Sequence, residues 1–191
     1  MPALVRIEPT NYVSVRGEGD PTAPEFYSAR SAVLALAEAL DRVVYGSLGV
    51  NHNPPIVEAL FWYEGVRAEP GIADFFGDGG QESHVSYRLM TRVGPRVITD
   101  HVLAAAESIG RERGIAPMPA AELFAYDEGI SIQMVHRGSL SNLQDSMGQL
   151  AEFASAHGLA RRGPHHELYP VPPVTGTART SWATMLRIPV R

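Results

Sequence analysis

The run His-His-Glu-Leu-Tyr at positions 165–169 holds the residues of this chain whose types and spacing best suit chemistry. If the run is a strand, His165, Glu167 and Tyr169 project from one face, with successive members about 7 Å apart. Glutamate is depleted in strands and rarely buried without a partner. In a cleft beside aromatic rings this carboxylate could balance a cationic ligand or act as a general base. An edge strand whose polar face meets water is the competing interpretation.

Aromatic side chains gather in the run Leu-Phe-Trp-Tyr at positions 60–63, on an expected strand of the first half of the chain. On that strand Trp62 shares a face with Glu58. Tyr87, on the next expected strand, and Met134, in the second half, are further candidates for contact with a ligand. Aromatic walls with one carboxylate suit a flat or cationic organic ligand. Aromatic clusters are more often core than binding site, so both interpretations stay open.

Other catalytic chemistry finds little support in the residue spacing. Adjacent His165 and His166 would point to opposite faces of a strand, and the remaining histidines lack the spacing of metal ligands on a helix. The turn at 17–20 lacks the Lys-Ser/Thr pair that grips phosphate, and no serine stands in a G-x-S-x-G nucleophile elbow. With no cysteine there is no thiolate nucleophile. We therefore expect no metal site and no organic cofactor.

Composition and charge narrow the class of protein further. The 191 residues are 45% apolar, which is ordinary for a globular chain of one large domain or two small halves. A formal net charge of −5 without a concentrated basic face argues against nucleic acid as a direct partner. The N-terminus lacks a signal-peptide core, and no stretch has the roughly 20 apolar residues that span a bilayer. We expect a cytoplasmic protein with no membrane partner.

A strand-helix-strand-strand pattern occurs twice along the chain. Each unit begins with an alternating strand, continues through a turn into an apolar-periodic helix, and closes with two further strands. The expected segments are 11–19, 24–45, 57–64 and 84–93 in the first unit, and 130–138, 140–157, 165–171 and 181–190 in the second. Two half-sheets of this kind cannot bury their apolar faces alone. The pattern predicts an α+β fold of two pseudo-symmetric modules with antiparallel sheets and a ligand cleft between them.

The segments between and around the modules have less regular patterns. Residues 1–10 are typical of a short lead-in strand, and a helix is expected near Asp100 to Arg113 with Thr99 as its N-cap. We interpret the chain as a single domain with module one at 1–95, a linking helix and segment at 96–126 and module two at 127–191. The Gly-rich stretch at 65–81 is expected to be an exposed excursion, and its composition does not tell whether it covers the cleft.

Three segments, Tyr12 to Phe26, Asp127 to Gly138 and His165 to Val190, resemble the GyrI-like small-molecule-binding family. They occur in the family's order through essentially the whole chain, and the run at 165–169 with the closing 185–190 is the most specific part. The resemblance implies the two-module fold that the repeat also predicts. Family members occur behind a DNA-binding helix-turn-helix module or as stand-alone proteins, and this chain resembles the stand-alone type.

Two activities are implied by this resemblance. One is promiscuous binding of amphipathic, often cationic, aromatic compounds around a central glutamate. The other, found in a stand-alone subgroup, is cofactor-independent hydrolysis of the strained cyclopropane of DNA-alkylating natural products, which detoxifies them and protects the cell. A non-catalytic multidrug binder, a ligand sensor that acts through an unknown protein partner, and a gyrase-inhibitor-like interaction protein remain as alternatives.

Carried over to this sequence, the family's pocket glutamate falls on Glu167 and its tyrosine on Tyr169. Glu167 would then deprotonate a water, Tyr169 would orient that water or the carboxylate, and His165 would adjoin the ligand. The family's tryptophan falls near Trp62 and would stack on a flat ligand. The stretch leading to it has an extra residue, so that either Phe61 occupies the tryptophan position or the strand is bulged.

Overall fold

The fold is taken from a computed structural model, which describes the chain except for residues 47–55, 65–70, 76–84, 114–120, 139–141 and 170–182. Strands and helices follow the expected order closely. The strands are β1 Ala3–Ile7, β2 Thr10–Glu18, β3 Val57–Tyr63, β4 Val85–Arg92, β5 Glu122–Tyr126, β6 Gly129–Arg137, β7 His165–Tyr169 and β8 Ala183–Pro189. The helices are α1 Pro24–Leu40 with a π-helical turn at Asp41–Tyr45, α2 Thr99–Arg113 and α3 Leu143–Ala156.

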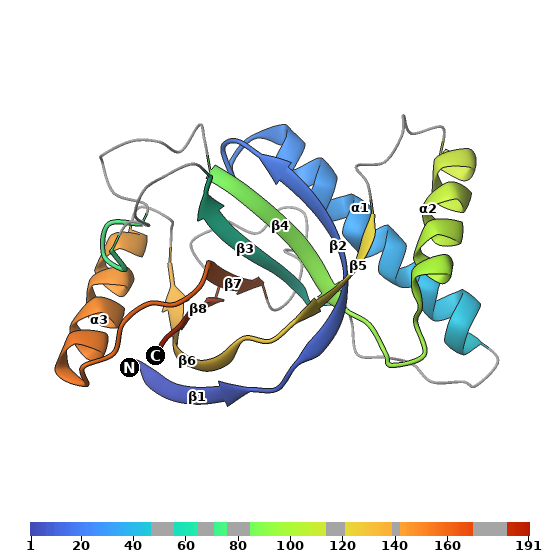
Figure 1. Cartoon of the computed structure of the whole chain (residues 1–191). Helices are drawn as coiled ribbons and strands as arrows, with labels where there is room; N and C mark the ends of the chain where they lie inside the picture. Colours follow the sequence, from blue (N-terminus) through green and yellow to red (C-terminus); the bar gives the residue numbers. More distant parts are fainter. Residues whose placement is uncertain (47–55, 65–70, 76–84, 114–120, 139–141, 170–182) are drawn as a thin grey trace.

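All eight strands of the described chain form one antiparallel sheet in the order β1-β6-β8-β7-β3-β4-β2-β5. The first module supplies β3, β4 and β2, the second supplies β7, β8 and β6, and the two meet where β3 pairs with β7. Figure 1 shows the sheet curling, with α3 near one module and α1 and α2 near the other. The predicted α+β fold of two pseudo-symmetric modules, with a cleft-like curvature, is confirmed.

Two outer strands do not pair with the strand that follows them in the chain. The lead-in strand β1 comes just before β2 but pairs with β6, whereas β5 comes just before β6 but pairs with β2. The two pairings have equivalent registers, because in each the last residue of the outer strand lies opposite the first residue of its partner. Ile7 of β1 lies opposite Gly129, and Tyr126 of β5 lies opposite Thr10. The prediction of a lead-in strand was right. Residues 122–126, which fall in the segment expected to link the modules, form β5 and extend the sheet beside β2.

A glycine with a positive φ angle follows the first strand of each module. Gly19 follows β2 with φ of 109°, and Gly138 follows β6 with φ of 126°. Side chains rarely adopt such positive φ values, so glycine lets both strands turn sharply toward their helices. This match between distant segments supports the repeat that the sequence pattern predicts.

The larger of two hydrophobic clusters in the described residues lies under the helices and extends through both modules. Helix α1 begins at Pro24, a favoured first helical residue, and buries Phe26, Val33 and Leu36 against the sheet. Helix α3 buries Met147 and other apolar residues in the same continuous cluster. No helix in the described ranges is long and apolar enough to cross a membrane.

Candidate functional site

Strand β7 places three polar side chains on the helix-covered face of the sheet. Glu167 is only 4% exposed and accepts hydrogen bonds at both carboxylate oxygens. His165 Nε2 lies 3.0 Å from Oε1, and the Tyr169 hydroxyl donates to Oε2 at 2.8 Å. The expected sharing of one face by these three residues is therefore present, and the carboxylate is enclosed instead of facing water.

The two neighbours of Glu167 are both neutral donors. Burial lowers the pKa of His165 despite the adjacent carboxylate, so the ring is uncharged at neutral pH and donates a single N–H. Burial, with the charge of Glu167, raises the pKa of Tyr169 well above its usual value, so its hydroxyl keeps its proton. An ionised carboxylate has about four acceptor positions, and these two bonds fill half of them. Glu167 can accept a further hydrogen bond from water or a ligand.

Glu167 also occupies a special position in the sheet. Six laterally paired residues form a row across the central strands, and Glu167 is its only charged member. Ala59 is its direct partner where the modules meet, so the pseudo-twofold axis passes between these two residues. The row runs Met134, Leu186, Glu167, Ala59, Leu89 and Val15. Met134, a predicted ligand contact, lies in the same row two strands away.

Aromatic rings from two strands and a helix adjoin this row. Phe61 lies opposite His165 in the paired strands, with ring centroids 6.2 Å apart. It stacks on Phe26 of α1 at 6.0 Å, and Phe26 meets Tyr87 edge-on at 4.9 Å. Tyr87 lies opposite Gly17, whose missing side chain leaves room for the ring. Phe26 was not predicted as a site residue, and its sequence signal was only the helical spacing of a core position.

Trp62 lies on the opposite face of the sheet from Glu167, which corrects its predicted role as the wall beside that carboxylate. β3 pairs regularly and without a bulge from Val57 to Tyr63, so consecutive residues alternate between the faces. Trp62 donates from Nε1 to Glu64 at 3.3 Å and lies beneath the Arg16 guanidinium. Phe61 is thus the aromatic residue of this pair on the Glu167 face.

Residues 71–75 cover the His165 end of the site. Phe75 is fully buried, its ring 5.2 Å from both His165 and Tyr63, and its carbonyl accepts a 2.8 Å hydrogen bond from the Tyr63 hydroxyl. The Arg161 guanidinium carbon lies 4.5 Å over the Phe75 ring. This part of the 65–81 excursion therefore packs on the site, while 65–70 and 76–81 fall outside the described residues.

An arginine that the sequence analysis did not single out approaches the site from α1. The guanidinium carbon of Arg30 lies 5.3 Å from the centre of the Tyr169 ring. Its Nε is buried and has no hydrogen-bond partner among the described residues. Burial lowers the pKa of Arg30, opposed by Tyr169, although the group stays charged at neutral pH because arginine titrates so high.

A second buried polar cluster lies on the other face of the sheet, around His166. Its Nδ1 is 3.0 Å from Glu128, and its Nε2 is 3.0 Å from Glu58 without hydrogen-bond alignment. Arg187 Nη1 donates to Glu128 at 3.0 Å, and Arg92 Nε donates to Glu58 at 2.8 Å. Two carboxylates and two guanidinium groups thus balance around one imidazole. Sequence reasoning placed His166 on this face but did not find its partners, which come from distant segments.

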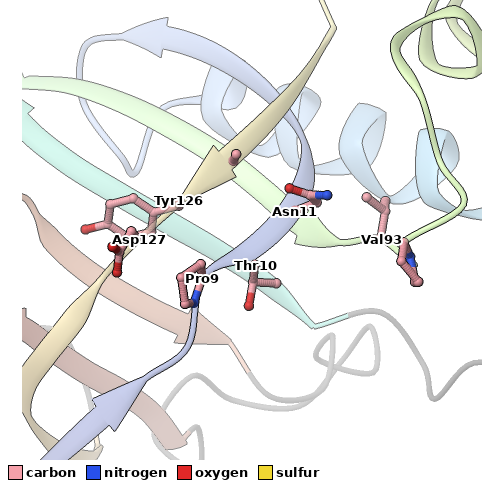
Figure 2. Close-up of a pocket in the computed structure, with 8 residues that line it drawn as sticks. Pro9, Thr10, Asn11, Val93, Tyr126 and Asp127 are labelled. Carbon is pink, nitrogen blue, oxygen red and sulfur yellow. The ribbon is translucent and has the colours of Figure 1, made fainter.

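A surface pocket of about 370 Å³ lies where the β1–β2 and β5–β6 connections meet (Figure 2). Its walls are mostly short polar and proline side chains. It is lined by Pro9, Thr10, Asn11, Val93, Pro95, Ala125, Tyr126 and Asp127. None of these residues is among those described above around Glu167, so this pocket is a separate feature of the fold.

Comparison with known proteins identifies the fold but no sequence family. No family model matches the chain, and no curated protein matches its sequence. An uncharacterized conserved protein from Listeria innocua superposes with a TM-score of 0.81 at 21% identity, covering 100% of this chain and 92% of that one. A hydrolase from Listeria innocua gives 0.77 at 20% identity, covering 100% and 91%. The C-terminal domain of EcmrR gives 0.62 at 12% identity, covering 100% and 97%. The chain therefore shares the fold of these proteins.

Proposed function

We propose that this chain is a GyrI-like protein that binds flat aromatic small molecules over the Glu167 row and hydrolyses an electrophilic strained ring in them, as in cyclopropane-bearing DNA alkylators. The observation that carries the proposal is an enclosed carboxylate held by two neutral donors at the junction of the modules. One protein of the same fold is described as a hydrolase, which agrees with a reactive site.

The chemistry requires a water, a base and a fixed ligand. Glu167 removes a proton from the water as its oxygen attacks a cyclopropane carbon, and a ring C–C bond breaks. The released electron pair moves into a conjugated carbonyl, whose oxygen then takes up a proton, so that one water is added overall. A positioned base contributes about 10²- to 10⁴-fold, and ring strain lowers the barrier further. No other reactant enters this step.

The surroundings of Glu167 suit this task. His165 and Tyr169 hold one oxygen each, which fixes the carboxylate without neutralising it by proton transfer. Phe61, Phe26 and Tyr87 form a buried cluster of rings beside it, against which a flat ligand would pack. Holding the reacting carbon near the base lowers the activation barrier, because the entropy of bringing the two groups together is already lost on binding.

Turnover separates hydrolysis from simple retention of the ligand. The protein is incubated with a cyclopropane-fused dienone, and the product is analysed by mass spectrometry for the gain of one water. Wild type should convert the compound, Glu167→Gln should lose at least about 100-fold in rate, and Glu64→Gln should behave as wild type. Glu64 is a suitable control because its side chain is exposed and pairs with Arg16 away from the site.

Binding of the unchanged compound by wild type would reject the hydrolytic proposal and leave a drug-binding or sensing role. Equal turnover by wild type and Glu167→Gln would reject Glu167 as the base. Circular dichroism and thermal unfolding of each variant show whether a lost activity reflects a lost fold.

A further inference from the structure

We infer that Arg30 contacts the ligand and donates a hydrogen bond to a carbonyl or phenolate oxygen, so that the site selects neutral or anionic aromatic carbonyl compounds over aromatic cations. This inference rests on the proposed function and specifies its substrate class. It also assigns a second polar contact to the site, opposite in charge to Glu167.

The position of Arg30 connects the aromatic rings with the carboxylate. Arg30 follows Phe26 by one helical turn, and residues four apart lie on the same side of a helix. Phe26 belongs to the ring cluster with Phe61 and Tyr87, and the Arg30 guanidinium adjoins the Tyr169 ring. Tyr169 in turn donates to Glu167. A ligand that contacts both the rings and the carboxylate therefore comes within reach of the guanidinium.

The hydrogen bonding of Arg30 is incomplete among the described residues. Its Nε is buried without a partner, and no carboxylate of the described chain forms an ion pair with it. A buried donor without an acceptor is unfavourable, and more so when it carries charge. Stacking on the Tyr169 ring offsets part of that cost but supplies no acceptor oxygen. An oxygen of the ligand would supply the missing acceptor.

The proposed reaction creates charge where such a donor is useful. When water attacks and the ring C–C bond breaks, the electron pair moves through the conjugated system to the carbonyl oxygen. That oxygen becomes an enolate or phenolate before it takes up a proton. A fixed guanidinium stabilises the developing negative charge, while Glu167 holds the proton taken from water. The same guanidinium would repel a cationic ligand.

The test uses 7-hydroxycoumarin, a flat phenol whose neutral and ionised forms absorb differently. Bound to wild type, its phenol should ionise at lower pH than in solution, with a phenolate preference of about tenfold or more, equal to one pKa unit. Arg30→Met should abolish this preference, and Arg30→Lys should restore part of it. The flat cation N-methylacridinium should bind Arg30→Met more tightly than wild type.

Arg16→Met is the matched control, because Arg16 lies 5.3 Å from the centre of the Trp62 ring on the opposite face, the same spacing as Arg30 over Tyr169. It should leave the binding of both probes and the ionisation of hydroxycoumarin as in wild type.

The inference is overturned if wild type fails to bind hydroxycoumarin or to shift its ionisation, or if Arg30→Met shifts it as wild type does. Failure of hydrolysis together with an Arg30-dependent shift would reject only the proposed catalysis, whereas hydrolysis with no such shift would reject only the role of Arg30.

Discussion

Ala59 lies directly opposite Glu167 in the strand pair β3–β7, where the central strands of the two modules meet. The two positions are equivalent within the repeat, since Ala59 continues the row from Val15 and Leu89 as Glu167 continues the row from Met134 and Leu186. One module therefore places a carboxylate at the axis and the other places a methyl group. The backbone is symmetric about the axis, but only one of the two modules supplies a carboxylate there.

The small side chain of Ala59 is expected to leave space for a ligand over the carboxylate. Ala59→Leu should reduce the affinity for 7-hydroxycoumarin about tenfold or more, and overpacking should lower the free energy of unfolding by about 1–3 kcal/mol. Ala59→Gly, which keeps the space, should cost about 0.5–1 kcal/mol of stability and retain binding. Absorbance titration and thermal unfolding measure the two effects. Unchanged affinity in Ala59→Leu would show that ligands bind elsewhere.

The two adjacent aromatic residues of β3 should behave differently on substitution. Phe61→Leu should weaken ligand binding, since Phe61 stacks on Phe26 beside His165. Trp62→Leu should leave ligand affinity within about twofold of wild type, because its ring lies on the other face with Leu60 and Met90. Such a change is below about 0.5 kcal/mol. Titration of both variants with the same ligand measures the two affinities. A larger loss of affinity in Trp62→Leu than in Phe61→Leu would contradict the proposed location of the site.

The close contact between Gly17 and Tyr87 gives a test of the aromatic wall that leaves its rings chemically intact. A Cβ at position 17 would overlap the Tyr87 ring, so Gly17→Ala must displace it. We expect weaker ligand binding and a loss of about 1–3 kcal/mol in unfolding free energy. Gly148→Ala in α3 is the control, because a Cβ there meets nothing within 4 Å, and it should stabilise the helix by up to about 1 kcal/mol. Normal binding by Gly17→Ala would remove Tyr87 from the site.

Most of the fold could be predicted from the sequence, because alternating and helical periodicities are strong in the repeated segments. The face of Glu167 followed from the same alternation, and so did the opposite orientation of His166. The strand at 122–126 was missed because it pairs with β2, a strand far away in the sequence, and no local pattern records that pairing. The choice between Phe61 and Trp62 stayed open in the sequence, because it depends on the pairing of β3 with β7, which no local pattern records. Arg30 could not be found, since an arginine on a helix is ordinary until its neighbour from β7 is known.

The adjacent histidines of β7 should give the folding stability two opposite dependences on pH. Burial lowers the pKa of His165 below its usual 6.5. The folded chain therefore binds fewer protons at this residue than the unfolded chain does, and the free energy of unfolding decreases as pH falls below about 6.5. Burial also acts on His166, but the carboxylates of Glu128 and Glu58 outweigh it and raise the pKa. Its stabilising effect is complete below 6.5 and is lost as pH rises through the raised value.

Denaturant unfolding at a series of pH values, for wild type and two single variants, separates these effects. In His166→Gln the fall in stability above pH 6.5 should shrink, although the variant is less stable overall because Glu58 and Glu128 lose their shared partner. In His165→Gln the fall in stability below pH 6.5 should shrink instead. If both variants keep the wild-type profile on both sides, the buried histidines do not titrate as their surroundings require. A stability that rises above pH 6.5 only when His166 is present would reverse the sign and reject the paired-carboxylate account.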